Sequence, residues 1–338
     1  MSTVNQIIDQ IRWTGKGYAR PRGLPYLLNS FKALAKARIL TDAADDRLAD
    51  ALEGCAAQPD LFFNDIIVRV LADPDNFRNR AIWAFYWAVV EAEHDLARDY
   101  DLNANEDGLN GAFLKTIVSS ARAFQHGSIS DGARTMIGAT HLVRKWNEGR
   151  TGADFAMVLA FQEDGVARYF TTIVQAKIAK RRSVNIDRAA GETTQLEKLY
   201  ASGIGQYLFY NEFESNVPTG MSAQLVYDQH KANYVDSLDF GDDFAARMAL
   251  LVPYEQVVDA PALDSPEAAL ERVFSTHIPD IAHYPVLVAV LNERGFSHDE
   301  VEAVQKRWNK ALERCERAYR AQHTPDDDRE NDATGFNI

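Results

Sequence analysis

TGADFAMVLAF, residues 151–161, and TTIVQAK, residues 171–177, decide the fold of this chain. Both runs are rich in the aliphatic, aromatic and β-branched residues typical of strands, and the QEDG that follows the first run is a turn signal. We therefore expect an antiparallel hairpin in which Asp154 begins the first strand and Gln175 and Lys177 end the second. Because side chains two residues apart share a strand face, Gln175 and Lys177 point the same way. A carboxylate, an amide and an ammonium group at one end of a hairpin indicate a site for a metal ion and a phosphate.

Composition places the chain among soluble globular proteins. It has 338 residues, of which 46% are hydrophobic and 25% charged, enough for about two domains. No apolar run approaches the roughly 18 residues of a membrane-spanning helix, and the N-terminus lacks the basic and apolar segments of a signal peptide. Cys55 and Cys315 lie far apart and in no zinc spacing. We therefore expect reduced thiols in a cytoplasmic protein that has no membrane partner.

The formal net charge of -13 argues against a generally basic nucleic-acid binder, although a local basic patch is enough to bind a polyanion. The densest basic group follows the second motif and comprises Lys177, Lys180, Arg181, Arg182 and Arg188. We expect this group to line the approach of nucleic acid, unless it only solubilises a loop. The basic stretch GKGYARPRG at residues 15–23 is either an exposed connector or a second nucleic-acid contact.

Both ends of the chain have helical patterns. Apolar residues at spacings of three and four predict helices within residues 1–104, at 29–39, 42–52, 66–71 and 81–90. Residues 256–322 are also expected to be helical, with helices that begin near Ser265 and Ser297. Residues 323–338 are acidic and lack apolar periodicity, so we expect a disordered tail.

The middle of the chain, residues 105–255, changes character. Asn105 is expected to cap a helix that carries Glu106 in its first turn. Strands are then expected at 134–146, 155–161, 169–176, 207–210 and 248–252, with a helix at 192–200. A helix, several strands, a helix and further strands indicate an α/β fold.

The order of the expected elements resembles that of the PD-(D/E)XK superfamily of restriction-endonuclease-like nucleases. It is a helix with Glu106, a strand with Asp154, and a strand with Gln175 and Lys177. The resemblance covers residues 105–255 and implies a mixed sheet flanked by helices. In that superfamily the first core helix supplies an acid and an Asp begins the second core strand. An acid, or sometimes Gln, then precedes a Lys by two positions on the third. This chain has the Gln-x-Lys variant.

A narrower likeness links the chain to restriction-endonuclease-like families of bacterial defence. It consists of GAD at residues 152–154, QAK at 175–177, QLEKL at 195–199 and YLFYN at 207–211. Gln195, on the helix after the third strand, is therefore a further candidate for contact with the site and with nucleic acid. The competing interpretation of Gln195 is a polar residue on a solvated helix face.

The chemistry of phosphodiester hydrolysis fits these residues. A hard cation, Mg²⁺ or Mn²⁺, lowers the pKa of a bound water and prefers oxygen ligands. The expected ligands are Asp154, Glu106, the amide oxygen of Gln175 and the carbonyl of Ala176. Lys177 would orient the attacking water. Glu148 is a rival to Glu106. Each residue also has a structural interpretation: Asp154 as a turn cap, Glu106 as an acid that favours a helix start, and Lys177 as a surface lysine.

The resemblance implies a metal-dependent endonuclease, with DNA favoured over RNA, that acts in bacterial antiviral defence. The helical ends would then provide oligomerisation, binding of a defence-system partner or control of activation. A second interpretation is a nucleic-acid-binding or regulatory protein that keeps the fold without catalysis, because Gln175 replaces an acid. A third is an interaction protein that functions through its helical ends.

Overall fold

The computed structural model describes most of the middle of the chain and separate pieces of its two ends. The described residues are 39–57, 70–71, 73–98, 104–127, 136–141, 153–163, 166–180, 184, 186, 189–190, 193–211, 218–231, 242–244, 247–248, 263, 265, 268–269, 271–272, 285–292, 306, 310, 313–314 and 317. Their elements are α3 (Asp42–Ala57), η2 (Pro74–Asn76), α5 (Arg80–Arg98), α6 (Glu106–Gly127), β1 (Met136–His141), β2 (Phe155–Glu163), β3 (Val166–Ala179), β4 (Ala189–Ala190), β5 (Thr193–Thr194), α7 (Gln195–Ala201), β6 (Gly205–Asn211), β7 (Thr219–Ser222), α8 (Ala223–Lys231), β8 (Asp242–Asp243) and β9 (Pro285–Asn292). They form an α/β structure.

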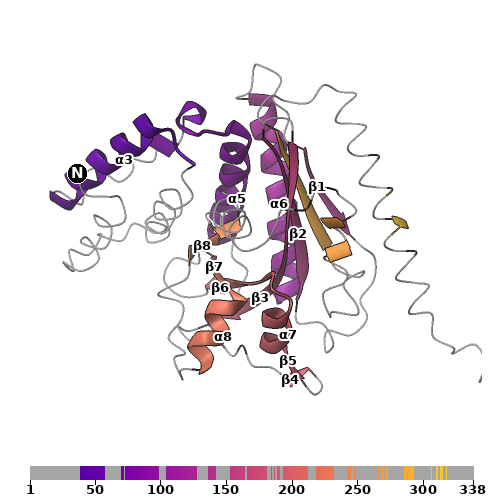
Figure 1. Ribbon diagram of the computed structural model, residues 1–338. Coiled ribbons are helices and arrows are strands. Elements are labelled where there is room, and N and C mark those ends of the chain that lie inside the picture. The colour runs from indigo at the N-terminus through magenta and orange to yellow at the C-terminus, as the bar shows by residue number, and fades with distance from the viewer. Residues whose placement is uncertain are drawn as a thin grey trace, which may run out of the picture.

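A mixed sheet of the order β1-β9-β2-β3-β6-β7-β8 forms the centre of the described structure (Figure 1). β2 and β3 are an antiparallel hairpin that pairs from Glu163 and Val166 back to Phe155 and Val174, so the predicted hairpin is confirmed. β9 runs parallel to β2, and β6 runs parallel to β3. The other neighbours pair antiparallel.

The helical prediction for residues 256–322 is wrong at 285–292. These residues, PVLVAVLN, form β9, which lies between β1 and β2. A short apolar run without polar alternation fits an inner strand or a buried helix equally well, so periodicity alone could not decide. The sheet therefore takes a strand from outside the predicted core of residues 105–255.

Most other predicted elements occur where the structure describes them. α3, α5, α6, β2, β3 and β6 cover predicted segments, and β1 lies within the predicted strand 134–146. The helix expected at 192–200 begins at Gln195, because Thr194 pairs with Ala189 and then caps the helix. Met248 lies in a helical turn with Arg247, so the strand predicted at 248–252 is wrong at its first residue.

Several expectations fall wholly or largely on residues outside the described ranges. They are the helices at 29–39 and 66–71, the basic stretch at 15–23, the helix start at Ser297 and the acidic tail 323–338. The helix start at Ser265 is described, and Ser265 Oγ accepts a hydrogen bond from the N–H of Ala268 at 3.1 Å, as an N-cap does.

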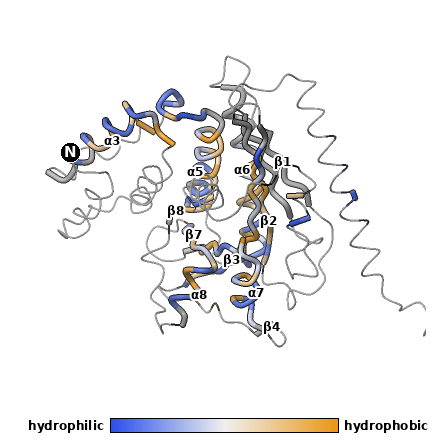
Figure 2. Tube along the Cα trace, viewed as in Figure 1, coloured by the Kyte–Doolittle hydropathy of each residue, from blue (hydrophilic) through white to orange (hydrophobic). Residues whose placement is uncertain are grey.

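Helices cover both faces of the sheet next to β3. Tyr207 and Tyr210 are three apart on β6 and therefore point to opposite faces. Tyr210 meets the ring of Phe113 from α6 edge to face, whereas Tyr207 belongs to a core cluster with Leu199 of α7 and Val226 of α8. Figure 2 shows hydrophobic residues along α5, α6 and β2, while α3 carries many hydrophilic ones. α6 thus lies on one face, and α7 with α8 on the other.

The connection from α7 to β6 is unusually close. Gly203 has φ of 68°, in the left-handed region where glycine is favoured. A Cβ added at Gly205 would lie 2.5 Å from the carbonyl oxygen of Leu199, which is a backbone atom and cannot turn aside as a side chain can. Gly205 therefore allows the end of α7 to touch the start of β6.

We predict that Gly205→Ala lowers the free energy of unfolding by about 2–3 kcal/mol, because the new methyl group overlaps fixed backbone. Urea denaturation followed by circular dichroism measures it. Gly111→Ala is the matched control, since Gly111 is an exposed residue of α6 and its added Cβ meets nothing within 4 Å. That variant should gain roughly 0.5–1 kcal/mol. Equal effects of the two substitutions would contradict the close approach.

Candidate functional site

The candidate site lies where β2 parts from β3. Pairing within the hairpin begins at Phe155 and Val174, and the N–H of Asp154 donates to the carbonyl of Val174 at 2.7 Å. β3 continues beyond this point and pairs with β6 on its other side. Because backbone groups alternate in direction along a strand, the N–H groups of Ala176 and Ile178 face the side that β2 has left. Buried backbone donors of this kind need partners.

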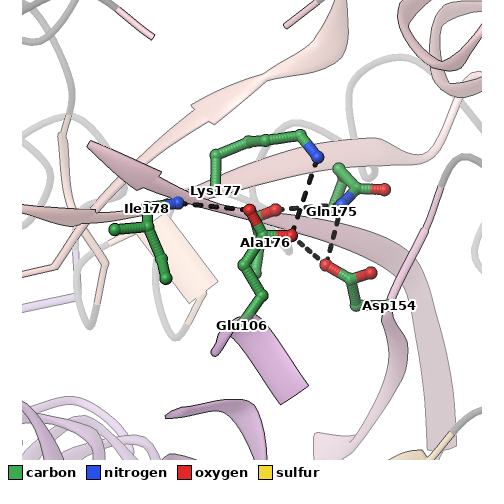
Figure 3. A network of polar contacts seen from close by, with 6 residues as sticks. All are labelled: Glu106, Asp154, Gln175, Ala176, Lys177 and Ile178. Atoms are coloured by element: carbon green, nitrogen blue, oxygen red, sulfur yellow. Dashed lines mark hydrogen bonds and ion pairs between the residues drawn. The ribbon is translucent and has the colours of Figure 1, made fainter. Parts of the chain in front are cut away.

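Two carboxylates accept these N–H groups, as Figure 3 shows. The N–H of Ala176 donates to Asp154 Oδ2 at 2.7 Å, and the N–H of Ile178 donates to Glu106 Oε1 at 3.4 Å. Asp154 immediately precedes β2, and Glu106 is the first residue of α6. Residues that are far apart in the sequence therefore meet at one strand edge.

The start of α6 is fixed by a cap. Asn105 Oδ1 accepts a hydrogen bond from the N–H of Gly108 at 2.8 Å, so the predicted cap is confirmed. Glu106 and Asp107 occupy the first turn, where the helix dipole favours acids. The dipole alone would explain an acid here, but it does not explain the contact of Glu106 with β3.

Lys177 lies beside Glu106. Its Nζ is 3.7 Å from Glu106 Oε2, and its side chain is only 9% exposed, while that of Glu106 is 35% exposed. A lysine this buried is not the surface residue of the structural interpretation, because burying an ammonium group is unfavourable without a partner. Glu106 supplies that partner.

Gln175 is buried and bonds to two oxygens of the site. Its Nε2 donates to Asp154 Oδ2 at 2.8 Å and to the carbonyl of Ala176 at 2.9 Å. Both oxygens are candidate metal ligands, and in this structure the amide N–H group of Gln175 bonds to both. In this orientation Gln175 is a donor, so a role as metal ligand requires its amide to rotate and present Oε1.

The environment of Asp154 disfavours its charge. Its pKa is raised to about 7, first because burial penalises the carboxylate and second because the charge of Glu106 is near. The hydrogen bond from Ala176 and the charge of Lys177 act in the opposite direction, and Asp107 adds a small further increase. A cation bound nearby would stabilise the charged form of this carboxyl group and lower its pKa.

The donor set suits a hard cation. Glu106, Asp154 and the carbonyl of Ala176 offer only oxygen, which Mg²⁺ and Mn²⁺ prefer. Within the described ranges no group of three or more His, Cys, Asp or Glu residues could hold a metal ion. The site would therefore rely on two carboxylates, a carbonyl and water, a combination that Mg²⁺ accepts because it keeps several waters.

The other predicted site residues have mixed outcomes. Lys180 is exposed just after β3, whereas Glu148, Arg181, Arg182 and Arg188 lie outside the described residues. Gln195 is only 7% exposed at the first turn of α7, so it is not on a solvated helix face, and little of it is accessible to a nucleic acid. The sequence reasoning missed the N–H of Ile178, although its position two residues after Ala176 carried the signal.

Helices of the described residues include none that is long and apolar enough to cross a membrane. Comparison of the chain with protein-family models, with curated proteins and with solved structures found no match.

Asp154 gives a testable pH dependence. Its pKa is about 7 in the folded protein against an ordinary value of 3.8. Between these values the unfolded chain has lost the proton that the folded protein still holds, so the free energy of unfolding falls as the pH rises from about 4 to 7. Asp154→Asn lacks this titration and should become more stable relative to the natural protein by about 2–4 kcal/mol across that window.

Denaturation in EDTA at several pH values between 4 and 8 measures this difference. The altered hydrogen bonds of Asn change the free energy of unfolding by the same amount at every pH. The change in the difference between the two proteins with pH therefore reports on the titration of Asp154 alone. Asp50→Asn, which removes an exposed carboxylate on α3, is the control. Parallel stability curves for Asp154→Asn and the natural protein would show that this carboxyl group does not hold its proton.

Proposed function

We propose that this protein is a metal-dependent nuclease that hydrolyses phosphodiester bonds through a restriction-endonuclease-like core. The observation that carries the proposal is the meeting of Glu106, Asp154 and Lys177 at the edge of β3 beyond Val174. Two carboxylates can hold a hard cation, and an ammonium group beside them can stabilise negative charge on a phosphate, which is what metal-assisted phosphodiester hydrolysis uses.

Mg²⁺ or Mn²⁺, when bound, would neutralise charge on the phosphate and lower the pKa of a water. Asp154 and Glu106 would hold the cation, with the carbonyl of Ala176 as a further ligand. Lys177 would orient the attacking water and stabilise the extra negative charge of the pentavalent phosphate, as a point charge in a site of low dielectric. Gln175 contributes no negative charge, which weakens cation binding relative to a fully acidic motif.

The order of elements is compatible with this proposal. α6 precedes β1, and the β2–β3 hairpin is followed by α7 and by β6, which returns parallel to β3. This arrangement has Asp154 before the second strand and Lys177 on the third, as the resemblance to restriction-endonuclease-like nucleases implies.

DNA is proposed as the substrate in preference to RNA, and a role in bacterial antiviral defence rests on the resemblance alone. Exposed Lys180 begins the basic segment that continues into residues 181–188, next to the site in sequence. A chain of charge -13 repels a polyanion at long range, so binding depends on such a local concentration of positive charge and is steeply salt-dependent. Further partners, a second copy or a defence-system protein, would bind through the helical regions.

A second candidate function is a nucleic-acid-binding or regulatory protein without catalysis. The observation that favours it is the amide of Gln175, which already bridges Asp154 and the carbonyl of Ala176. A titration with Mn²⁺ by calorimetry distinguishes the two candidates. A catalytic site binds Mn²⁺ in a way that Asp154→Ala abolishes, whereas a degenerate site shows no affinity that depends on Asp154.

We predict that the protein cleaves nucleic acid in Mg²⁺ or Mn²⁺ and not in EDTA. Plasmid DNA, linear DNA and RNA are the substrates, and gel electrophoresis is the measurement. Lys177→Ala should lower the cleavage rate by roughly 100-fold or more, because it removes stabilisation of the transition state. Lys115→Ala, an exposed lysine of α6, is the matched control and should keep full activity. Equal loss in both variants, or cleavage that persists in EDTA, would contradict the proposal.

The additional acid is predicted to be Glu106 and not Glu148. Glu106 lies on a capped helix and contacts β3, and rigid placement favours cation binding. Glu106→Ala should therefore lose at least roughly tenfold in Mn²⁺ affinity along with cleavage. Full cleavage by Glu106→Ala together with none by Glu148→Ala would reverse the assignment.

A further inference from the structure

A buried hydrogen bond joins α6 to β6 one helical turn beyond Glu106. The hydroxyl of Tyr210 donates to Asn110 Oδ1 at 2.7 Å. Tyr210 is completely buried and Asn110 is 4% exposed, so the bond lies in the interior. The ring of Tyr210 also meets that of Phe113 edge to face, at a centroid distance of 6.3 Å. Phe113 in turn contacts Phe244 at 5.5 Å.

This contact and the site belong to the same stripe of α6. Glu106, Asn110 and Phe113 are spaced by four and three residues, so they lie on one face of the helix. On the sheet, Tyr210 of β6 is the register partner of Ile178 of β3, whose N–H donates to Glu106. Two successive turns of α6 therefore bond to neighbouring strands of the sheet. The carboxylate of Glu106 bonds to β3, and the amide of Asn110 bonds to β6.

The carboxylate of Glu106 is not held firmly by its own contacts. Its hydrogen bond from Ile178 is 3.4 Å long and its ion pair with Lys177 is 3.7 Å long, both beyond the range of strong hydrogen bonds. Asp154 repels it whenever both groups are charged. The Asn105 cap bonds to Gly108 of the same helix, so it fixes where α6 begins along the chain. The distance of Glu106 from β3 therefore depends on how the rest of α6 packs, against α5, β1 and β3 and through its bond to β6.

We propose that Tyr210 and Asn110 are positioning residues, which set the place of Glu106 at the metal site by fixing α6 against β6. What the positioned carboxylate does rests on the proposed function, whereas its position does not. The short bond has a direction as well as a length, so it restricts the rotation and the axial shift of α6. Apolar packing by Phe113 alone tolerates small slides of a helix over a sheet.

The purely structural alternative is that the pair only satisfies two buried polar groups. A variant that removes both groups of this bond separates the two ideas, because neither the hydroxyl nor the amide oxygen is then left without the other. Tyr210→Phe combined with Asn110→Leu is that variant. Tyr210→Phe alone is the second variant, because it keeps the ring contact with Phe113 and gives the same readouts if the double variant folds poorly.

The first readout is hydrogen exchange of single backbone amides, measured by NMR without metal. The N–H of Ile178 reports on Glu106, and the N–H of Ala176, held by Asp154, is the internal reference. We expect the Ile178 amide to exchange roughly tenfold faster in the double variant while the Ala176 amide is unchanged. The second readout is Mn²⁺ affinity by calorimetry, which should fall roughly tenfold, as for other residues that orient metal ligands. Tyr86→Phe, in a fully buried tyrosine of α5, is the matched control.

Unchanged protection of Ile178 in a folded double variant would overturn the proposal, whatever the Mn²⁺ affinity. Weaker binding of Mn²⁺ with unchanged protection of Ile178 would therefore have another cause, since Glu106 would still be in place. Absence of Mn²⁺ affinity in the natural protein would overturn the proposed function instead, and the exchange rates would still decide whether Tyr210 and Asn110 position Glu106.

Discussion

Backbone donors on the open edge of β3 are the constraint on which the site depends. β2 stops pairing at Val174, while β3 runs on beside β6, so two N–H groups point to a side of β3 where none of the described strands pairs with them. Leaving them unpaired in the interior would cost several kcal/mol in total. Asp154 and Glu106 pair with them, and the same requirement brings two negative charges within reach of each other. Lys177 then offsets part of that charge from the same strand.

The arrangement has stored electrostatic free energy. Asp154 is desolvated and faces a second acid, so its carboxyl group is a poor place for a negative charge without a cation. Gln175 relieves part of this strain with a neutral donor, and it does so without the charge that a divalent ion would bring. A cation bound beside these carboxylates would offset this unfavourable charge. Such tension between stability and chemistry is common at functional sites.

Local sequence signals accounted for the parts of the site that depend on local structure. The hairpin followed from two β-rich runs and a turn, the cap at Asn105 followed from side-chain chemistry, and the spacing of Gln175 and Lys177 set their common face. β9 could not be predicted, because its apolar run of 285–292 has no period that distinguishes strand from helix and its partners lie far away in the chain. The short apolar run that begins at Met248 also fits either a strand or a helix, and Met248 lies in a helical turn. The orientation of the Gln175 amide and the link between Tyr210 and Asn110 depend on tertiary contacts, which no pattern in one segment contains.

β9 also determines the order in which this sheet can be completed. The β2–β3 hairpin closes a short loop and can form as soon as its residues have been synthesised. β1 and β2, however, are separated in the sheet by a strand that the ribosome makes much later, since Met136 pairs with Val290 and Val158 with Val288. Until then β2 has an open edge of unpaired backbone groups, which is the kind of surface that recruits strands from other chains. Pairing between strands this far apart in the chain slows folding, so the late insertion of β9 is the step by which the half of the sheet that carries Asp154 loses its open edge.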